Sequence, residues 1–166
     1  MKDAARELTV AVLTASDRCS QGAPDLSGPL LARFANDLGF RVVEQAVLPD
    51  DKLAIAKKLL HWSDELGVSL IVTTGGTGAA PRDVTPEATR MVLERPFPGI
   101  SEALRTESLK HTPAGMIGRG EAGSRGSTLI VNFPGQPKAI EQLWPVVSSV
   151  VVHACRLLLG EQHPHP

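Results

Sequence analysis

Short apolar runs alternate with helical patterns along the chain. Residues 8–14, 40–48, 68–74 and 127–133 are short and rich in Val, Ile and Leu, which predicts four strands. An apolar stripe at helical spacing lies between the first two runs, at residues 30, 31, 34 and 38. A second such stripe lies between the second and third runs, at residues 55, 59, 62 and 66. Nearly continuous apolar strands that alternate with helices predict an α/β fold, a mainly parallel sheet with helices on both faces.

The ends of the two predicted helices carry recognisable signals. Ser27 is expected to cap the first helix, with Pro29 in its first turn. Gly39 is expected to end this helix, and Gly67 the second one, because glycine adopts the left-handed conformation that closes a helix.

The last apolar stretch, residues 143–159, predicts a buried C-terminal helix. Pro145, His153 and Arg156 interrupt it, and it is shorter than the ~20 residues that a membrane span needs. We find no repeat or linker, so residues 1–166 are expected to form one domain, with residues 1–7 and 161–166 as frayed ends. Two histidines in the tail fit either a metal site or a frayed end, and we prefer the frayed end.

Composition and charge narrow the possible partners. The chain is 42% hydrophobic and 21% charged, as in an ordinary soluble protein. Its net charge of −1, without a basic block, argues against binding to nucleic acid or to an acidic membrane. Cys19 and Cys155 form no CxxC pair and are interpreted as reduced thiols. Because no apolar stretch precedes Leu8, no signal peptide is predicted, and a cytoplasmic location follows.

Ligands of such sheets bind beyond the carboxyl ends of the strands, where residues 15–29, 49–51, 75–84 and 134–138 are expected to meet. One of these loops contains Gly75, Gly76 and Gly78, which can turn backbone N–H groups together into a concavity that favours an anion. Thr85 is expected to cap the next helix, with Pro86 in its first turn, so that the positive end of a helix dipole lies close by. The loop matches neither a Walker A sequence nor a dinucleotide fingerprint.

Charged residues near this edge admit two interpretations each. Asp83 is either an acid stabilised by the helix dipole or a ligand that holds Mg²⁺ against bound phosphates. Asp50 and Asp51 follow the second strand and are either solvated or part of the same site. Arg82 could pair with a phosphate or simply be solvated.

Other polar positions are also ambiguous by composition. Ser16 and Asp17 are loop residues, and either could cap a turn. Ser108 could be a serine on a helix surface, and Asn132 could tie down the turn before Pro134.

Several of these residues belong to longer motifs. The stretches "TTGGTG..PRDVTPEAT", "ESLK.TP", "AG.RGSTLIVNFPG.P" and the early "SDR…D.SGP" resemble those of the molybdopterin adenylyltransferases. This is the MogA-like family of molybdenum cofactor biosynthesis, which includes a domain of gephyrin, and the resemblance runs from residue 8 to residue 159. It implies a MogA/MoaB-like domain that forms homotrimers. It also implies transfer of AMP from Mg-ATP to the terminal phosphate of molybdopterin, with release of pyrophosphate, before a partner protein inserts molybdate.

The resemblance also assigns roles to residues. The acids Asp50 and Asp83 fall on the family's catalytic and metal positions, and nucleotide-binding roles fall on Gly75, Gly76, Thr77 and Gly78. Substrate contacts are expected from Ser16, Asp17, Ser108, Asn132, Pro134 and Gly135. Ser124 and Gly118 depart from the family pattern, where an aliphatic residue and a Ser or Ala are usual, and both departures concern the shape of the pterin pocket.

The residues fit the implied chemistry. The nucleophile is a phosphate, which is already anionic, so no serine, cysteine or histidine has to be activated. Positioning two phosphorylated molecules and neutralising their charge would be sufficient. Three alternatives stay open: a non-catalytic molybdopterin-binding scaffold, a metal-insertion domain of the same fold, and a nucleotide hydrolase.

Overall fold

A computed structural model describes residues 6–161. Within this range six strands form one sheet in the order β2-β1-β3-β6-β5-β4. The first four strands in this order are parallel, and β5 and β4 run antiparallel to their neighbours. Their bounds are β1 Thr9–Ala15, β2 Arg41–Leu48, β3 Leu70–Thr74, β4 Arg95–Pro96, β5 Ala122–Arg125 and β6 Thr128–Phe133.

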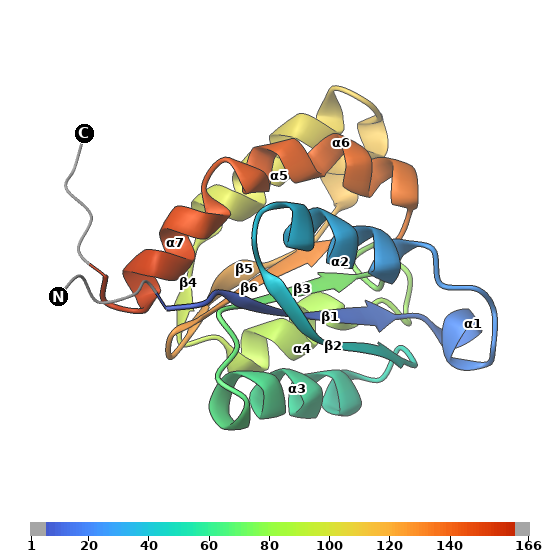
Figure 1. Cartoon of the computed structure of the whole chain (residues 1–166). Coiled ribbons are helices and arrows are strands. Elements are labelled where there is room, and N and C mark those ends of the chain that lie inside the picture. Colours follow the sequence, from blue (N-terminus) through green and yellow to red (C-terminus); the bar gives the residue numbers. More distant parts are fainter. Residues whose placement is uncertain (1–5, 162–166) are drawn as a thin grey trace, which may run out of the picture.

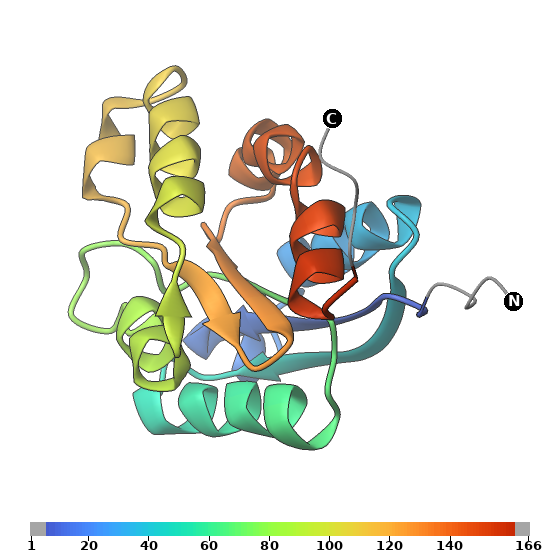
Figure 2. The same ribbon diagram turned by 90° about the vertical axis from the view of Figure 1, so that its left-hand side faces the viewer.

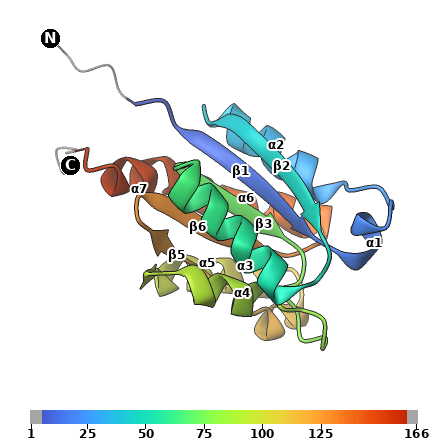
Figure 3. The same ribbon diagram turned by 90° about the horizontal axis from the view of Figure 1, so that it is seen from below.

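Helices cover both faces of this sheet (Figure 1). Seen from below, α3 and α4 lie in front of it (Figure 3). The helices are α1 Asp17–Ser20, α2 Ser27–Asp37, α3 Lys52–Leu60, α4 Thr85–Val92, α5 Pro98–Leu109, α6 Pro137–Ser148 and α7 Val151–Leu158. A π-helical turn, His61–Glu65, extends α3, and a 3-10 turn, Pro113–Ile117, follows α5.

Successive side chains of a strand point to opposite faces of the sheet, so each buried strand contributes side chains to two hydrophobic cores. Val10 and Val12 of β1 pack with α2, α5, α6 and α7 in one core. Ala11 and Leu13 pack with α3 and α4 in the other. The predicted α/β architecture is therefore confirmed, and the four predicted strands are β1, β2, β3 and β6. Sequence analysis missed β4 and β5, which are short and contain Arg, Pro, Gly and Ser rather than apolar runs.

The predicted end of the first helix is confirmed, but its predicted cap is wrong. Gly39 follows the helix with φ 91°. Ser27 is the first helical residue, and its hydroxyl donates to the carbonyl of Gly135 at 2.7 Å. Asp25 performs the capping, because its Oδ1 accepts the N–H groups of Ser27 and Gly28 at 3.1 and 3.0 Å. Gly67, φ 60°, closes the second helix as predicted.

The prediction of one C-terminal helix over residues 143–159 is also wrong. The helix breaks after Ser148 and starts again at Val151. At the break, the hydroxyls of Ser148 and Ser149 donate to backbone carbonyls three residues back, and such side-chain bonds compete with the helical pattern. Within residues 6–161, no helix is long and apolar enough to cross a membrane.

The predicted frayed ends are described only in part. Glu7 pairs with Arg41 at 2.8 Å, and Glu161 pairs with Arg156 at 2.9 Å. Residues 1–5 and 162–166, which include the tail histidines, lie outside the described residues. Both cysteines are free, as expected, and burial raises the pKa of the Cys155 thiol to about 12.

Candidate active site

The loops predicted to meet do so, at the edge of the sheet to which the arrowheads of β1 and β2 point in Figure 1. They form two clefts, of about 390 and about 440 Å³. The first cleft lies among the loops after β1, β2, β3 and β6 and includes Ser16, Asp25, Ser27 and Asp50. The second cleft includes Ser108, Thr112 and Gly118, from the end of α5 and the segment after it. Five residues line both clefts: Gly75, Gly76, Asp83, Gly135 and Gln136.

Gly75 and Gly76 form the wall between the clefts and require the conformation of glycine. Their φ angles are 88° and 64°. A Cβ on Gly75 would lie 2.2 Å from the carbonyl oxygen of Ala15, and one on Gly76 would lie 2.3 Å from Thr85 Oγ1. The N–H of Gly75 donates to the carbonyl of Phe133 at 3.2 Å, so this group continues the sheet and is not available to an anion.

The N–H groups of Gly76, Thr77 and Gly78, by contrast, have no hydrogen-bond acceptor in the part of the chain that the structure describes. Successive unpaired N–H groups in such a loop favour an anion. Gly76 lies on both clefts, whereas Thr77 and Gly78 line only the second. The four residues predicted on the nucleotide side are thus divided between the two clefts.

The predicted cap of α4 is wrong. Thr85 is the first helical residue, and Val84 occupies the cap position without a side-chain bond. The hydroxyl of Thr85 donates to the carbonyl of Gly75 at 2.9 Å, and its N–H donates to the carbonyl of Gly76 at 3.1 Å. Thr85 therefore fixes the glycine loop instead of capping the helix.

Asp50 is placed by a reciprocal pair of hydrogen bonds. Its Oδ2 accepts the N–H of Asp17, and Asp17 Oδ1 accepts the N–H of Asp50, both at 3.0 Å. Asp50 Oδ1 is buried and has no hydrogen-bond partner. Burial raises the pKa of Asp50, and the nearby carboxylates of Asp17 and Asp83 raise it further. A buried carboxylate oxygen without a hydrogen-bond donor is a suitable ligand for a cation.

Arg82 is an exposed residue that pairs with an acid of a neighbouring loop. Its guanidinium binds Asp17 through two bonds, of 2.6 and 2.9 Å, and also donates to the carbonyl of Asp50 at 3.2 Å. The hydrogen bond from Arg82 lowers the pKa of Asp17. Asp17 lines neither cleft, and its described contacts position Asp50.

Of the three acids that line the first cleft, Asp50 and Asp83 fit a magnesium ion. Asp83 Oδ2 accepts the N–H of Ala80 at 2.8 Å, a bond within its own loop rather than to the following helix. Its other oxygen, like Oδ1 of Asp50, has no donor among the described residues. Residues 6–161 contain no group of three or more His, Cys, Asp or Glu side chains arranged for a metal. Mg²⁺ needs only one or two carboxylates when phosphates and water complete its shell.

Of the predicted substrate residues, all but Ser16 and Asp17 lie on the second cleft or next to it. Ser108, Pro134 and Gly135 line it. Asn132 lines an adjoining cavity of about 60 Å³, together with Ser108 and Thr77. Asn132 does not tie down the turn before Pro134. Its Nδ2 donates to the hydroxyls of Thr73 and Thr89 at 2.9 and 3.0 Å, and its Oδ1 accepts the N–H of Glu121 at 3.0 Å.

The remaining positions singled out in the sequence are Ser16, Gly118 and Ser124. Ser16 caps α1 by accepting the N–H of Cys19 and lines the first cleft. Of the two departures from the family pattern, Gly118 lines the second cleft, whereas Ser124 is buried in β5, away from both clefts.

Sequence analysis missed the contributions of Asp25 and Arg119. Asp25 accepts a 2.6 Å bond from the Thr14 hydroxyl and lines the first cleft. Its position two residues before Ser27 is a usable capping signal. Arg119 binds backbone carbonyls of the glycine loop, which no local pattern indicates because the two segments lie about 40 residues apart.

We predict that Asp50→Asn raises the melting temperature at about pH 7 by a few degrees, when measured in EDTA without nucleotide. A carboxyl whose pKa is raised on folding favours its neutral form, so its contribution to stability falls as pH rises through the folded-state pKa. Asparagine removes the charge and can still accept the N–H of Asp17. The gain should disappear at acidic pH, where Asp50 is neutral. A lower melting temperature at neutral pH would contradict the description of this site.

A family model described as a probable molybdopterin binding domain matches residues 11–153. The molybdopterin adenylyltransferase of Helicobacter pylori strain J99 is 39% identical over 154 residues, which cover 91% of this chain and 88% of that protein. The crystal structure of the molybdopterin biosynthesis enzyme MoaB from Thermus thermophilus superposes with a TM-score of 0.86 at 41% identity, covering 92% of this chain and 97% of that one.

A longer relative contains a similar segment. The molybdenum cofactor synthesis protein cinnamon of Drosophila melanogaster is 41% identical over 153 residues, which cover 91% of this chain but 26% of cinnamon. The family match extends over most of this chain, and the clefts are built from residues within it. The chain therefore belongs to the family of probable molybdopterin-binding domains of molybdenum cofactor biosynthesis.

Proposed function

We propose that the protein is a molybdopterin adenylyltransferase, which transfers AMP from Mg-ATP to the terminal phosphate of molybdopterin. The observation that carries this proposal is the pair of clefts that share Gly75, Gly76 and Asp83. Two substrates bound on opposite sides of this wall would bring their phosphates together beside unpaired N–H groups and two acids. The relatives named molybdopterin adenylyltransferase support the reaction.

In this proposal ATP occupies the first cleft and molybdopterin the second. A terminal phosphate oxygen of molybdopterin attacks the α-phosphorus of ATP, the bond from that phosphorus to the bridging oxygen breaks, and pyrophosphate leaves. The N–H groups of Gly76, Thr77 and Gly78 stabilise the added negative charge, and they act strongly because they are already oriented. Asp50 and Asp83 would hold Mg²⁺, which neutralises phosphate charge when it is bound.

Among the alternatives, a molybdopterin-binding scaffold would need the second cleft but not two acids in the first. Both Asp50 and Asp83 are present, and each keeps an oxygen free of hydrogen bonds from the described residues.

Binding of ATP and of molybdopterin, measured separately by calorimetry, tests the assignment of the two clefts. The Ser108→Ala variant should weaken molybdopterin binding and leave ATP binding unchanged.

The proposed metal role leads to a second prediction. We expect ATP to bind at least about 10-fold more weakly in EDTA than in Mg²⁺, because two carboxylates would otherwise face the phosphates without a cation between them. Calorimetric titration of the protein with ATP in each buffer measures the change. Equal affinities in the two buffers would argue against a metal at Asp50 and Asp83.

An exposed apolar face leads to a third prediction, on the oligomeric state of the protein. An apolar groove of about 490 Å³ lies between α5 and the α6–α7 pair and is lined mainly by Phe97, Ile100, Ala103, Val146, Val150 and Ala154. We propose that this face is covered by another copy of the chain in a homotrimer. Light scattering at micromolar concentration should give three times the mass of the chain. A monomeric mass would refute the trimer, and Ile100→Asp should weaken it.

We further propose that the reaction takes place in the cytoplasm, because both cysteines are free thiols, as expected for a reducing compartment. The adenylylated product carries a phosphoanhydride bond that a later enzyme can cleave. A protein that inserts molybdate is therefore the proposed downstream partner.

A further inference from the structure

Arg119 holds the glycine loop through three of its backbone carbonyls. Its backbone N–H donates to the carbonyl of Thr77 at 2.9 Å. In its side chain, Nε donates to the carbonyl of Gly78 and Nη2 to the carbonyl of Asp83, each at 2.7 Å. Nη1 binds the carboxylate of Glu87. One residue thus contacts both ends of the loop and the helix that follows it.

These contacts determine the direction of the loop's N–H groups. In a planar trans peptide, the carbonyl of one residue and the N–H of the next point in opposite directions. Thr85 takes the carbonyls of Gly75 and Gly76, and Arg119 takes those of Thr77 and Gly78. All four carbonyls are therefore bound by the protein. The N–H groups of Gly76 and Thr77 are therefore directed away from Thr85, and that of Gly78 away from Arg119. None of these three groups has an acceptor among residues 6–161.

Arg119 also connects the loop to the second cleft. Its neighbours Gly118 and Gly120 line the adjoining cavity with Ser108 and Asn132. This cavity lies near α5 and the 3-10 turn, which stand side by side in Figure 2. A displacement of the segment around Arg119 would change both the cavity wall and the orientation of the peptides of the loop.

Each nitrogen of the guanidinium binds a group of the protein. Its three described donors go to two carbonyls and to Glu87, which balances its charge. The planar fork of arginine can reach three acceptors in fixed directions, which the single ammonium group of lysine does not reproduce. The described contacts of Arg119 therefore fix the geometry of the loop.

We propose that Arg119 is a positioning residue: its backbone N–H fixes the peptide that carries the N–H of Gly78, its side chain holds the loop at the carbonyls of Gly78 and Asp83, and it links this arrangement to the second cleft. The kinetic part of this proposal rests on the adenylyltransferase function proposed above. The geometric part, that Arg119 orders the loop, does not depend on it.

The test compares Arg119→Lys and Arg119→Ala with Arg90→Ala. Arg90 is the matched control because its guanidinium binds Glu121 at 2.8 Å and approaches Glu87 at 3.6 Å but contacts no carbonyl of the loop. We expect kcat to fall about 100-fold in both Arg119 variants, since misplacing reacting groups by about 1 Å has effects of this size. The KM for molybdopterin should change much less, and guanidinium ion should partly restore the alanine variant. Arg90→Ala should behave as the unmodified protein.

Amide NMR signals give a second, independent readout. In both Arg119 variants the amide signals of Ala79 and Val84, whose peptides lose their bonds to the guanidinium, and that of the adjacent Gly78 should shift and broaden, and in Arg90→Ala they should not. Unchanged loop signals, a normal kcat in Arg119→Lys, or failure of both Arg119 variants to fold would overturn the proposal. If the unmodified protein transfers no AMP, the proposed function fails, whereas the loop signals still decide the role of Arg119.

Discussion

Replacing Asp83 by asparagine should leave a folded protein that transfers AMP at least about 100-fold more slowly. Asparagine keeps the size of the side chain and can accept the 2.8 Å bond from the N–H of Ala80, so the loss of stability should stay within about 1 kcal/mol. The charge that would hold Mg²⁺ on the transferring phosphate is removed. Molybdopterin should still bind with little change: Asp83 also lines the second cleft, but asparagine keeps the size of the side chain, and the contacts expected from Ser108 and Asn132 are unaltered. Single-turnover rates and binding titrations measure the two effects separately.

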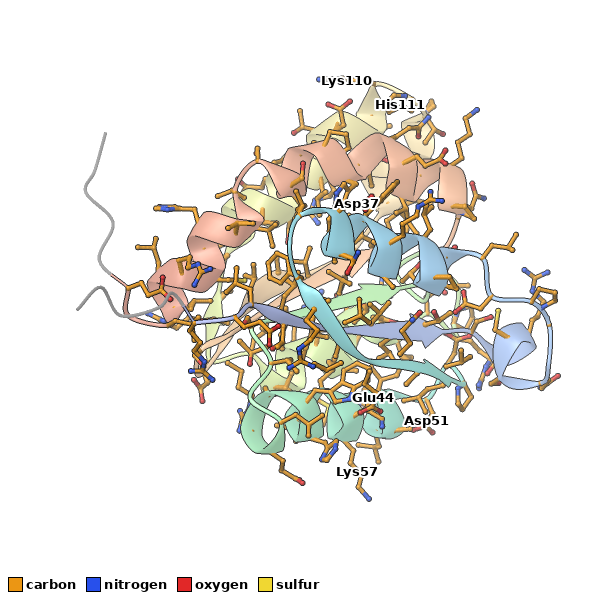
Figure 4. All side chains as sticks on the ribbon, viewed as in Figure 1. Asp37, Glu44, Asp51, Lys57, Lys110 and His111 are labelled. Carbon is orange, nitrogen blue, oxygen red and sulfur yellow. The ribbon has the colours of Figure 1, made fainter. Side chains whose placement is uncertain are left out.

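Asp51→Asn provides the matched control. Asp51 is the neighbour of Asp50, and its carboxylate also accepts one backbone N–H, that of Ala54 at 2.7 Å, as the cap of α3. It lines neither cleft, and Figure 4 shows it at the start of α3. This variant should retain full activity. Near-normal turnover by Asp83→Asn would mean that Asp83 only supports its loop.

The largest effect on stability is expected from Gly75→Ala. A Cβ at this position would lie 2.2 Å from the carbonyl oxygen of Ala15, and φ is 88°. The obstacle is backbone of the central strand β1, which cannot move aside as a flexible side chain could. We expect a loss of at least about 3 kcal/mol in the free energy of unfolding, measured by urea denaturation, from the combined backbone strain and overlap.

Gly39→Ala separates these two contributions. Gly39 has nearly the same φ, 91°, but a Cβ there would meet nothing within 4 Å. This variant should lose about 1 kcal/mol, from the left-handed conformation alone. Equal losses for the two variants would show that the approach of Gly75 to Ala15 is not the reason for glycine in the loop.

The fold could be predicted where local sequence determines structure. Strands β1, β3 and β6 are buried on both faces, so they read as continuous apolar runs, and Gly39 ends α2 for a purely local reason. The caps could not be assigned in the same way. Ser27 and Thr85 both stand in sequences typical of capping residues, yet tertiary contacts direct their hydroxyls to the carbonyls of Gly135 and Gly75.

The positions of several candidate residues could also be predicted from the sequence. Its acids and glycines could be found because they follow strands whose carboxyl ends meet at one edge. The partners of these residues could not be found, because they come from distant segments. Arg82 pairs with Asp17, 65 positions away, and Arg119 binds Gly78, 41 positions away. Such contacts depend on how the loops pack, which the periodicity of the sequence does not encode.

The most direct test of the proposed function is to incubate the protein with molybdopterin, Mg²⁺ and ATP labelled at the α-phosphorus. The proposal predicts that the label appears on molybdopterin as its adenylyl derivative, with one pyrophosphate released for each molecule formed. Omitting molybdopterin should abolish pyrophosphate release. Binding of both ligands without a labelled product, or release of labelled AMP in the absence of molybdopterin, would contradict it.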